Sequence, residues 1–126
     1  MFEVGAELIF SAAHHIPGYP GDCARVHGHN FRVCVRAKVQ KTDHLGMALD
    51  FRSLKSALKE IIAPWDHQDL NRLEDFKNRP STAEQIAQLT FERLKHQLKD
   101  TRAKITEVKV WENDCYWAAY SEEGER

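Results

Sequence analysis

Two long segments of this chain alternate between apolar and polar side chains, and this period of two constrains the fold more than any other feature of the sequence. In the first segment the even positions are apolar: Phe2, Val4, Ala6, Leu8, Phe10 and Ala12. In the second segment the odd positions are apolar: Phe31, Val33, Val35, Ala37 and Val39. Because successive side chains of a strand point to opposite faces of a sheet, the pattern predicts two long strands, each with one buried face.

Two amphipathic helices are predicted in the middle of the chain. The first begins after Asp50, a suitable N-cap, and ends near Pro64. Its apolar residues recur at helical spacing: Phe51, Leu54, Leu58, Ile61 and Ile62. The second begins at a capping box formed by Ser81 and Glu84, and its apolar stripe continues to Leu98.

Two shorter strands are predicted near the C-terminal end, over residues 105–112 and 115–120, joined through Asn113 and Asp114. The order of elements is therefore strand, strand, helix, helix, strand, strand, which predicts an α+β fold. We expect a four-stranded antiparallel sheet with both helices on one face. A chain of 126 residues has the usual size of one compact unit, so residues 1–126 are predicted to form a single domain.

Charge and cysteine content argue against several classes of function. The chain has 18 Lys and Arg against 19 Asp and Glu, and the basic residues are scattered, so no nucleic-acid partner is expected. The N-terminal residues form neither a basic leader nor a long apolar run, so we expect no secretory signal and no membrane span. Cys23, Cys34 and Cys115 match no disulfide framework, which favours a reducing, cytoplasmic setting.

Histidines are clustered near the ends of the two long strands: four of the seven lie between positions 14 and 29. His27 and His29 are two residues apart and share a strand face, and His14 continues the buried parity of the first strand. Antiparallel pairing would bring the three imidazoles together. Three nitrogen ligands without a fourth are typical of catalytic zinc, although imidazole also binds iron, copper and nickel.

The residues alone leave two alternatives open for this cluster. His27, Gly28 and His29 could form an exposed turn with two solvated imidazoles. His15 competes with His14 for the ligand position, although its odd parity directs it away from the buried face.

Further residues carry acid–base chemistry. Cys23 lies just before His27, where a metal would favour a thiolate base, the alternative being a small buried thiol. Asp66 could orient His67 as a proton relay, the alternative being a solvated pair or a helix cap. Glu112 shares the parity of the buried positions of its strand, so it would meet a guanidine-like group there unless the strand end turns to water.

Six short segments of the chain form a recognisable set. The first two are FSAAH at 10–14 and CARVHGHN at 23–30. The others are GMALDF at 46–51, DHQDLN at 66–71, STAE at 81–84 and VWE at 110–112. Together they resemble the family of 6-pyruvoyl-tetrahydropterin and 6-carboxy-tetrahydropterin synthases. Their order and spacing agree with the predicted elements, and the resemblance covers nearly the whole chain. Pro80-Ser81-Thr82 differs from this family by one extra residue where a Pro-Thr pair is commoner.

The resemblance implies the tunnelling fold, in which subunits join their sheets into a barrel, usually a homohexamer built as a dimer of trimers, with an active site between subunits. It implies three zinc ligands: His14, His27 and His29. It also implies that Cys23 abstracts a proton, that Asp66 orients His67 as a relay, and that Glu112 anchors the pterin ring. Thr82 is a further candidate for contact with the ring.

The resemblance also implies a substrate and a reaction. Three residues separate Cys23 from His27, a spacing similar to that of the 6-carboxy-tetrahydropterin synthases of queuosine biosynthesis. We therefore expect a lyase that converts 7,8-dihydroneopterin triphosphate to 6-carboxy-5,6,7,8-tetrahydropterin, with release of acetaldehyde and triphosphate. The alternatives are a 6-pyruvoyl-tetrahydropterin synthase, which eliminates triphosphate from the same substrate, and a non-catalytic zinc-containing pterin-binding module. The presence of Cys23 argues against the folate-pathway relatives, in which a glutamate replaces it.

Overall fold

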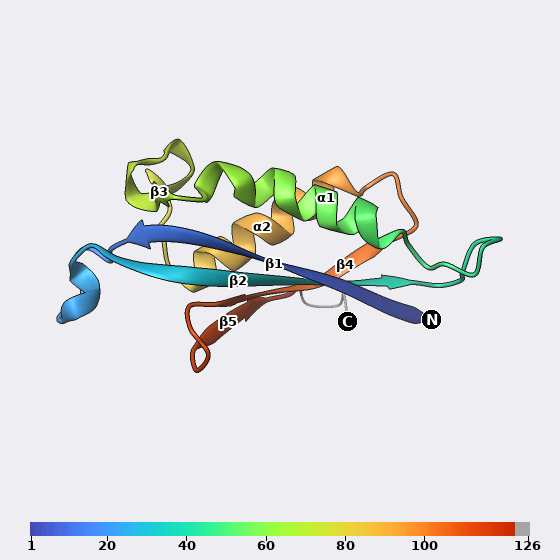
Figure 1. The fold of residues 1–126 in the computed structure, drawn as a ribbon, viewed down its shortest axis with the longest axis horizontal. Helices are drawn as coiled ribbons and strands as arrows, with labels where there is room; N and C mark the ends of the chain where they lie inside the picture. Colours follow the sequence, from blue (N-terminus) through green and yellow to red (C-terminus); the bar gives the residue numbers. More distant parts are fainter. Residues whose placement is uncertain (123–126) are drawn as a thin grey trace.

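The computed structural model describes residues 1–122, which form one twisted sheet with two helices on a single face (Figure 1). The strands are β1 (Phe2–His14), β2 (His27–Val39), β3 (Gln68–Asp69), β4 (Lys104–Trp111) and β5 (Trp117–Tyr120). The helices are α1 (Phe51–Ile62) and α2 (Ala83–Gln97). The α+β fold with its two helices is therefore confirmed. Within residues 1–122, neither helix is long and apolar enough to cross a membrane.

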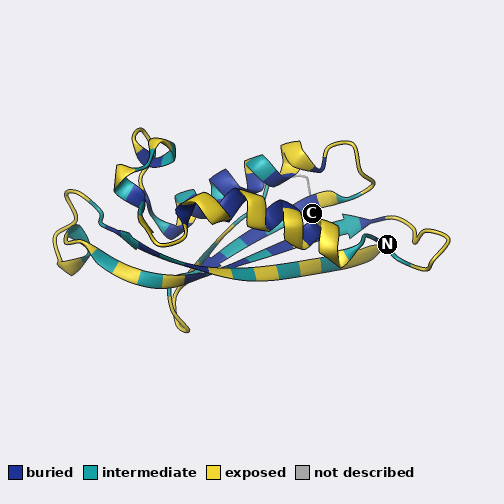
Figure 2. Cartoon of the chain, turned by 45° about the horizontal axis from the view of Figure 1, so that its top comes forward, coloured by how far each residue is buried: buried dark blue, intermediate teal, exposed yellow. Residues whose placement is uncertain are grey.

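The long antiparallel pair β1–β2 forms the central part of the sheet. The two strands pair antiparallel over their whole length, from Phe2 opposite Val39 to His14 opposite His27. The residues of predicted buried parity face the helices, and Phe10 and Phe31 stack there with ring centroids 5.0 Å apart. More buried and more exposed residues alternate along both strands in Figure 2, as the period of two predicts.

The prediction of a four-stranded antiparallel sheet is wrong. Within residues 1–122 the sheet has five strands in the order β3-β1-β2-β4-β5, and β3 runs parallel to β1. Only Ala12 with Gln68 and Ala13 with Asp69 are paired between them. A strand of two residues is too short to show any hydrophobic period, so pattern analysis could not detect it. Its effect is to place residues 66–69 against the end of β1.

Helix α1 begins as predicted, because the Asp50 side chain accepts a hydrogen bond from the Arg52 amide at 2.8 Å. Helix α2 begins one residue later than predicted: its N-cap is Thr82, which accepts from the Gln85 amide at 3.2 Å. Serine is on average the better N-cap of the two, but threonine is also a common one, so propensity favoured Ser81 although Thr82 is the cap. Ser81 is instead buried, and its hydroxyl bonds elsewhere.

The turn between β4 and β5 is also longer than predicted. Strand β4 ends at Trp111 and β5 begins at Trp117, which is its paired residue. The Asn113 side chain accepts hydrogen bonds from the Cys115 and Tyr116 amides at 2.8 and 2.9 Å. Because the Cys115 and Tyr116 amides bond to this side chain, they do not pair with β4, and β5 begins only at Trp117.

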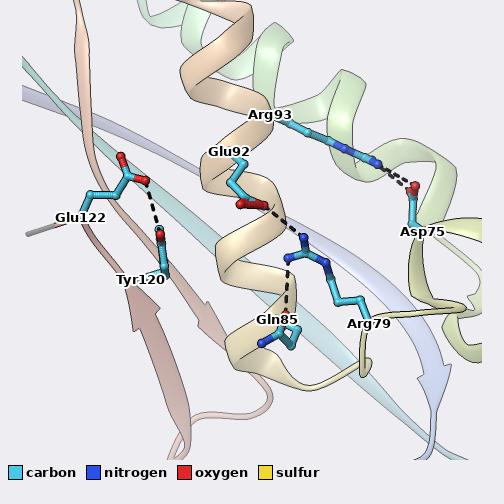
Figure 3. A network of polar contacts seen from close by, with 7 residues as sticks. All are labelled: Asp75, Arg79, Gln85, Glu92, Arg93, Tyr120 and Glu122. Carbon is cyan, nitrogen blue, oxygen red and sulfur yellow. Dashed lines mark hydrogen bonds and ion pairs between the residues drawn. The ribbon is translucent and has the colours of Figure 1, made fainter.

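The segment between the helices, residues 63–82, is fastened to α2 by Asp75. Its carboxylate accepts two hydrogen bonds from Arg93, at 3.0 and 2.6 Å, and one from the indole of the fully buried Trp65, at 2.9 Å. Arg79 contacts α2 beside this pair, through Gln85 and Glu92 (Figure 3). The hydrogen bonds from Arg93 and then Trp65 lower the pKa of Asp75, against the opposing effect of burial.

We expect Asp75→Ala to lower the free energy of unfolding by about 1–3 kcal/mol, because it leaves the buried Trp65 N–H without a partner. The matched control is Glu74→Ala, which removes only an exposed pair with Lys77 and should change it by less than about 0.5 kcal/mol. Urea unfolding at neutral pH measures both. Because the folded-state pKa of Asp75 is lowered, its contribution should be lost as the pH falls through that pKa. Equal losses in the two variants would contradict the anchoring role of Asp75.

Candidate metal centre

Three histidines meet where β1 ends and β2 begins. His14 lies opposite His27 in the ladder, and His29 follows two residues later on the same face. Their ring centroids are 4.5 Å apart for His14 and His27, 5.1 Å for His14 and His29, and 4.8 Å for His27 and His29. One nitrogen from each ring lies within 4.8 Å of the others. The predicted convergence of these side chains is therefore confirmed, and His15 does not belong to the group.

Backbone carbonyls determine which nitrogen of two of these rings carries the proton. His14 Nδ1 lies 2.7 Å from the Ser81 carbonyl oxygen, and His27 Nδ1 lies 2.7 Å from the Arg25 carbonyl oxygen. A carbonyl can only accept, so each Nδ1 must carry a hydrogen, and each Nε2 keeps its lone pair when the ring is neutral. This arrangement is typical of metal-binding histidines.

The Nε2 atoms of His14 and His29 are buried and have no hydrogen-bond partner within the described part of the chain. A buried nitrogen without a partner is costly, and a bound cation would satisfy both atoms. Burial lowers the pKa of His14, opposed by its bond to Ser81, and the neighbouring His27 and His29 lower it further. Burial also lowers the pKa of His29. Both rings are therefore neutral at neutral pH, which is the form that binds a metal.

The donor set fits a zinc ion with an open coordination position. Three imidazoles face one another, and within residues 1–122 the carboxylate oxygen paired with them is Glu112 Oε2, 3.9 Å from His29 Nε2. Glu112 lies just after β4, where its amide donates to the Tyr116 carbonyl at 3.0 Å. Its side chain is only 25% exposed. Glu112 is thus a half-buried carboxylate beside the histidines, on the side that sequence parity predicted.

Asp66 and His67 are held against the outer edge of β1 at Ser11. The Ser11 amide donates to Asp66 Oδ1 at 2.9 Å, and its carbonyl accepts from the His67 amide at 2.6 Å. His67 Nδ1 lies 3.0 Å from the same Asp66 oxygen. The bond from Ser11 and then that from His67 lower the pKa of Asp66, so the carboxylate is charged at neutral pH and can orient the ring.

His67 and His29 line the same open hollow, whose volume is about 500 Å³. The backbone at His67 has φ 60°, a left-handed conformation that is uncommon for histidine. Its side chain is 80% exposed, so the ring is free to meet another molecule. The conformation is sustained by the two backbone contacts at Ser11.

Within residues 1–122, no hydrogen bond joins the side chain of Cys23 or Thr82 to these groups. Cys23 lies half-buried in a short 3-10 turn, Asp22–Ala24, and within residues 1–122 no hydrogen bond joins its sulfur to His67 or to the three histidines. The Thr82 hydroxyl is used as a helix cap. Cys34 is unsuited to act as a base, because burial and then its hydrogen bond to Glu7 raise its pKa to about 12. The roles of Cys23 and Thr82 remain predictions.

Sequence analysis missed Ser11 and Asn71, and it assigned Ser81 only a capping role. Ser11 contacts Asp66 and His67, and Ser81 contacts His14, through backbone atoms, which a residue pattern does not report. Asn71 belongs to the DHQDLN segment, but nothing in that segment indicates that its side chain bonds to His15. These residues hold Asp66, His14 and the backbone of His15 in place.

We expect the purified protein to bind one zinc ion per chain and His27→Ala to weaken that binding by more than about a hundredfold, the upper range for losing a partner of a ligand. His15→Ala is the control, because His15 lies outside the cluster. Competition with a chromophoric chelator measures both affinities. A strong loss in His15→Ala together with full binding in His27→Ala would overturn the assignment.

Known proteins similar to this chain agree with its geometry. A family model described as 6-pyruvoyl tetrahydropterin synthase matches residues 3–123. A protein of Archaeoglobus fulgidus, provisionally named 6-carboxy-5,6,7,8-tetrahydropterin synthase, is 36% identical over 91% of each chain. The 6-carboxy-5,6,7,8-tetrahydropterin synthase of Haemophilus influenzae is 29% identical over 97% of this chain and 100% of its own.

Among solved structures, the 6-pyruvoyl tetrahydropterin synthase of Caenorhabditis elegans superposes with a TM-score of 0.82 at 27% identity, covering 98% of each chain. The similarity of fold and sequence thus extends over the same elements that carry the histidine cluster. This chain belongs to the 6-pyruvoyl tetrahydropterin synthase family.

Proposed function

We propose that this protein is a zinc-dependent 6-carboxy-tetrahydropterin synthase. It would convert 7,8-dihydroneopterin triphosphate to 6-carboxy-5,6,7,8-tetrahydropterin and release acetaldehyde and triphosphate. The observation that carries the proposal is the group of His14, His27 and His29, with buried nitrogens that lack a partner within residues 1–122. Membership of the family supplies the substrate class.

In this proposal His14, His27 and His29 hold the zinc ion. A bound zinc would polarise the side-chain hydroxyls of the substrate and make the adjacent C–H bonds more acidic. Cys23, as a thiolate, would take a proton from the substrate side chain. His67, oriented by Asp66, would exchange protons with it, since an imidazole gains and loses protons near neutral pH.

Glu112 is assigned to the pterin ring. A half-buried carboxylate can accept two hydrogen bonds from the guanidine-like edge of a pterin, which fixes the ring relative to His29. Thr82 is a further candidate contact, but its hydroxyl already caps α2, so we assign it a minor role.

Two observations favour the carboxy product over the pyruvoyl product. Three residues separate Cys23 from His27, and the relatives from Archaeoglobus and Haemophilus carry the 6-carboxy name. The queuosine pathway is the setting that this product implies. The alternative is a 6-pyruvoyl-tetrahydropterin synthase, the name of the Caenorhabditis structure, and a non-catalytic zinc-containing pterin-binding module is the third possibility.

We further propose that the chain assembles into a homohexamer, a dimer of trimers, whose sheets join into barrels. Both edges of the sheet support this idea: β5 is one edge, and the outer edge of β1 pairs with β3 only at Ala12 and Ala13. Open strand edges bind further strands readily. Assembly would also explain why Cys23 and His67 are not connected within one chain, since a neighbour could supply one of them. The three free cysteines suit a reducing cytoplasm.

The reaction is tested by incubating zinc-loaded protein with 7,8-dihydroneopterin triphosphate and determining product masses. We expect 6-carboxy-tetrahydropterin with acetaldehyde. A 6-pyruvoyl product would replace the first choice with the alternative, whereas no product from metal-replete protein would favour the binding module.

Cys23→Ala tests the assigned base. We expect zinc content to stay at the wild-type level while turnover falls at least about a hundredfold, the usual scale for losing a proton-transfer group. Cys115→Ala is the matched control, because that thiol is exposed on the β4–β5 turn. Unchanged turnover in Cys23→Ala would remove Cys23 from the mechanism.

Ile9→Pro tests the assembly. The Ser11 amide and carbonyl both point away from β2, to Asp66 and His67, so by strand alternation the Ile9 amide also points to the open edge. Proline there removes no bond of the β1–β2 ladder and blocks pairing with a neighbour. We expect a folded protein by circular dichroism that elutes as a smaller species in light-scattering chromatography. A full-size assembly would rule out pairing at this edge.

A further inference from the structure

The side chain of Asn71 grips the backbone of the residue that follows His14. Its Oδ1 accepts a hydrogen bond from the His15 amide at 3.0 Å, and its Nδ2 donates to the His15 carbonyl at 2.9 Å. The amide group of Asn71 therefore extends the pairing of β1 beyond its last residue. Only this orientation of the side-chain amide matches donors with acceptors. A flipped amide would place Nδ2 against the His15 N–H, which are both donors, and Oδ1 against the His15 carbonyl, which are both acceptors.

Ser81 connects the Asn71 side chain to the proposed metal ligand His14. Its hydroxyl lies 2.9 Å from Asn71 Oδ1 and 3.3 Å from the His15 carbonyl oxygen. Its own carbonyl accepts the hydrogen of His14 Nδ1 at 2.7 Å. Ser81 is 2% exposed and His14 is fully buried, so the bond between these two residues is shielded from water. The path from Asn71 to His14 therefore consists of two hydrogen bonds joined through the covalent structure of Ser81.

We propose that Asn71 is a positioning residue for the metal centre: through Ser81 it fixes the ring orientation and the tautomer of His14. The inference rests on the proposed zinc function. Ser81 lies between Pro80 and Thr82, and the structure assigns it the carbonyl that orients His14.

The chemistry of the site requires an asparagine at position 71. Oδ1 uses both of its lone pairs, one for the His15 amide and one for the Ser81 hydroxyl, while Nδ2 supplies the donor for the His15 carbonyl. Aspartate would keep the acceptors but lose the donor and place a negative charge beside that carbonyl. Alanine would lose all three bonds.

Asn71 is itself held in place, which lets it act on His14. It lies in the 3-10 turn Leu70–Arg72, where its backbone N–H donates to Asp69 Oδ1 at 3.2 Å. The neighbouring Leu70 is fully buried. The preceding β3 pairs with β1. A positioning group is effective only when its own freedom has been removed in this way.

The test compares Asn71→Ala with Asp75→Ala, which weakens the same segment through contacts with Trp65 and Arg93 rather than with His14 or His15. Three quantities are measured: zinc affinity by chelator competition, the visible spectrum of the Co²⁺-substituted protein, and the His14 tautomer. Long-range proton–nitrogen NMR of the metal-free protein at about pH 8, where free imidazole is neutral, reports the tautomer.

We expect Asn71→Ala to weaken zinc binding about 10–100-fold, to change the Co²⁺ spectrum, and to reduce the Nδ1–H population of His14. Asn71→Asp should not restore these properties, and Ser81→Ala, which keeps its carbonyl, should show a smaller effect in the same direction. If Asn71→Ala does not fold, the Ser81→Ala comparison carries the test. Asp75→Ala should lose stability while keeping zinc affinity, Co²⁺ spectrum and tautomer.

Wild-type zinc affinity in Asn71→Ala, or equal losses in Asn71→Ala and Asp75→Ala, would overturn the positioning role. A wild-type protein that binds no zinc would refute the proposed metal function instead. In that case the tautomer of His14 in the metal-free variants still decides whether Asn71 controls the ring, so the two failures are distinguishable.

Discussion

The continuous ladder between β1 and β2 is the interaction on which the rest of the structure depends. Thirteen residues of each strand pair without an irregularity, and the last pair joins His14 to His27. A slip of one residue would turn every side chain of a strand to the opposite face, taking the buried aromatic residues out of the core. The packing of Phe10 on Phe31 therefore sets the register that brings the histidines together.

A second constraint is the way residues 63–82 return to the end of β1. This segment has little regular structure, yet it is attached at three points along its length. Asp75 bonds to Trp65 within the segment and ties it to Arg93 of α2. The Ser11 backbone bonds to Asp66 and His67, and Asn71 bonds to the backbone of His15. Each attachment gives a polar group a specific partner in place of water, so this irregular segment has a defined position against β1 and α2. The candidate catalytic pair and the support of His14 both come from this segment.

The metal centre and the candidate acid–base groups differ in how complete they are within one chain. The three imidazoles lie together, and carbonyl acceptors orient the rings of His14 and His27. His67 is mostly exposed and lies at an open hollow, while Cys23 is on a separate turn. A rigid metal site with its reactive groups exposed at a strand edge is well suited to completion by a neighbouring subunit.

The amino-acid sequence by itself determined the elements with a strong period: the two long strands, the helix capped by Asp50, the amphipathic α2, and the shared face of His14, His27 and His29. These follow from local backbone geometry, which side-chain alternation reports directly. Only the tertiary structure decided that β3 joins the sheet, that Thr82 rather than Ser81 caps α2, and that Asn71 and Ser81 stand behind His14. Those features depend on backbone carbonyls and on residues more than fifty positions apart in the chain, and such contacts leave no periodic trace in a sequence.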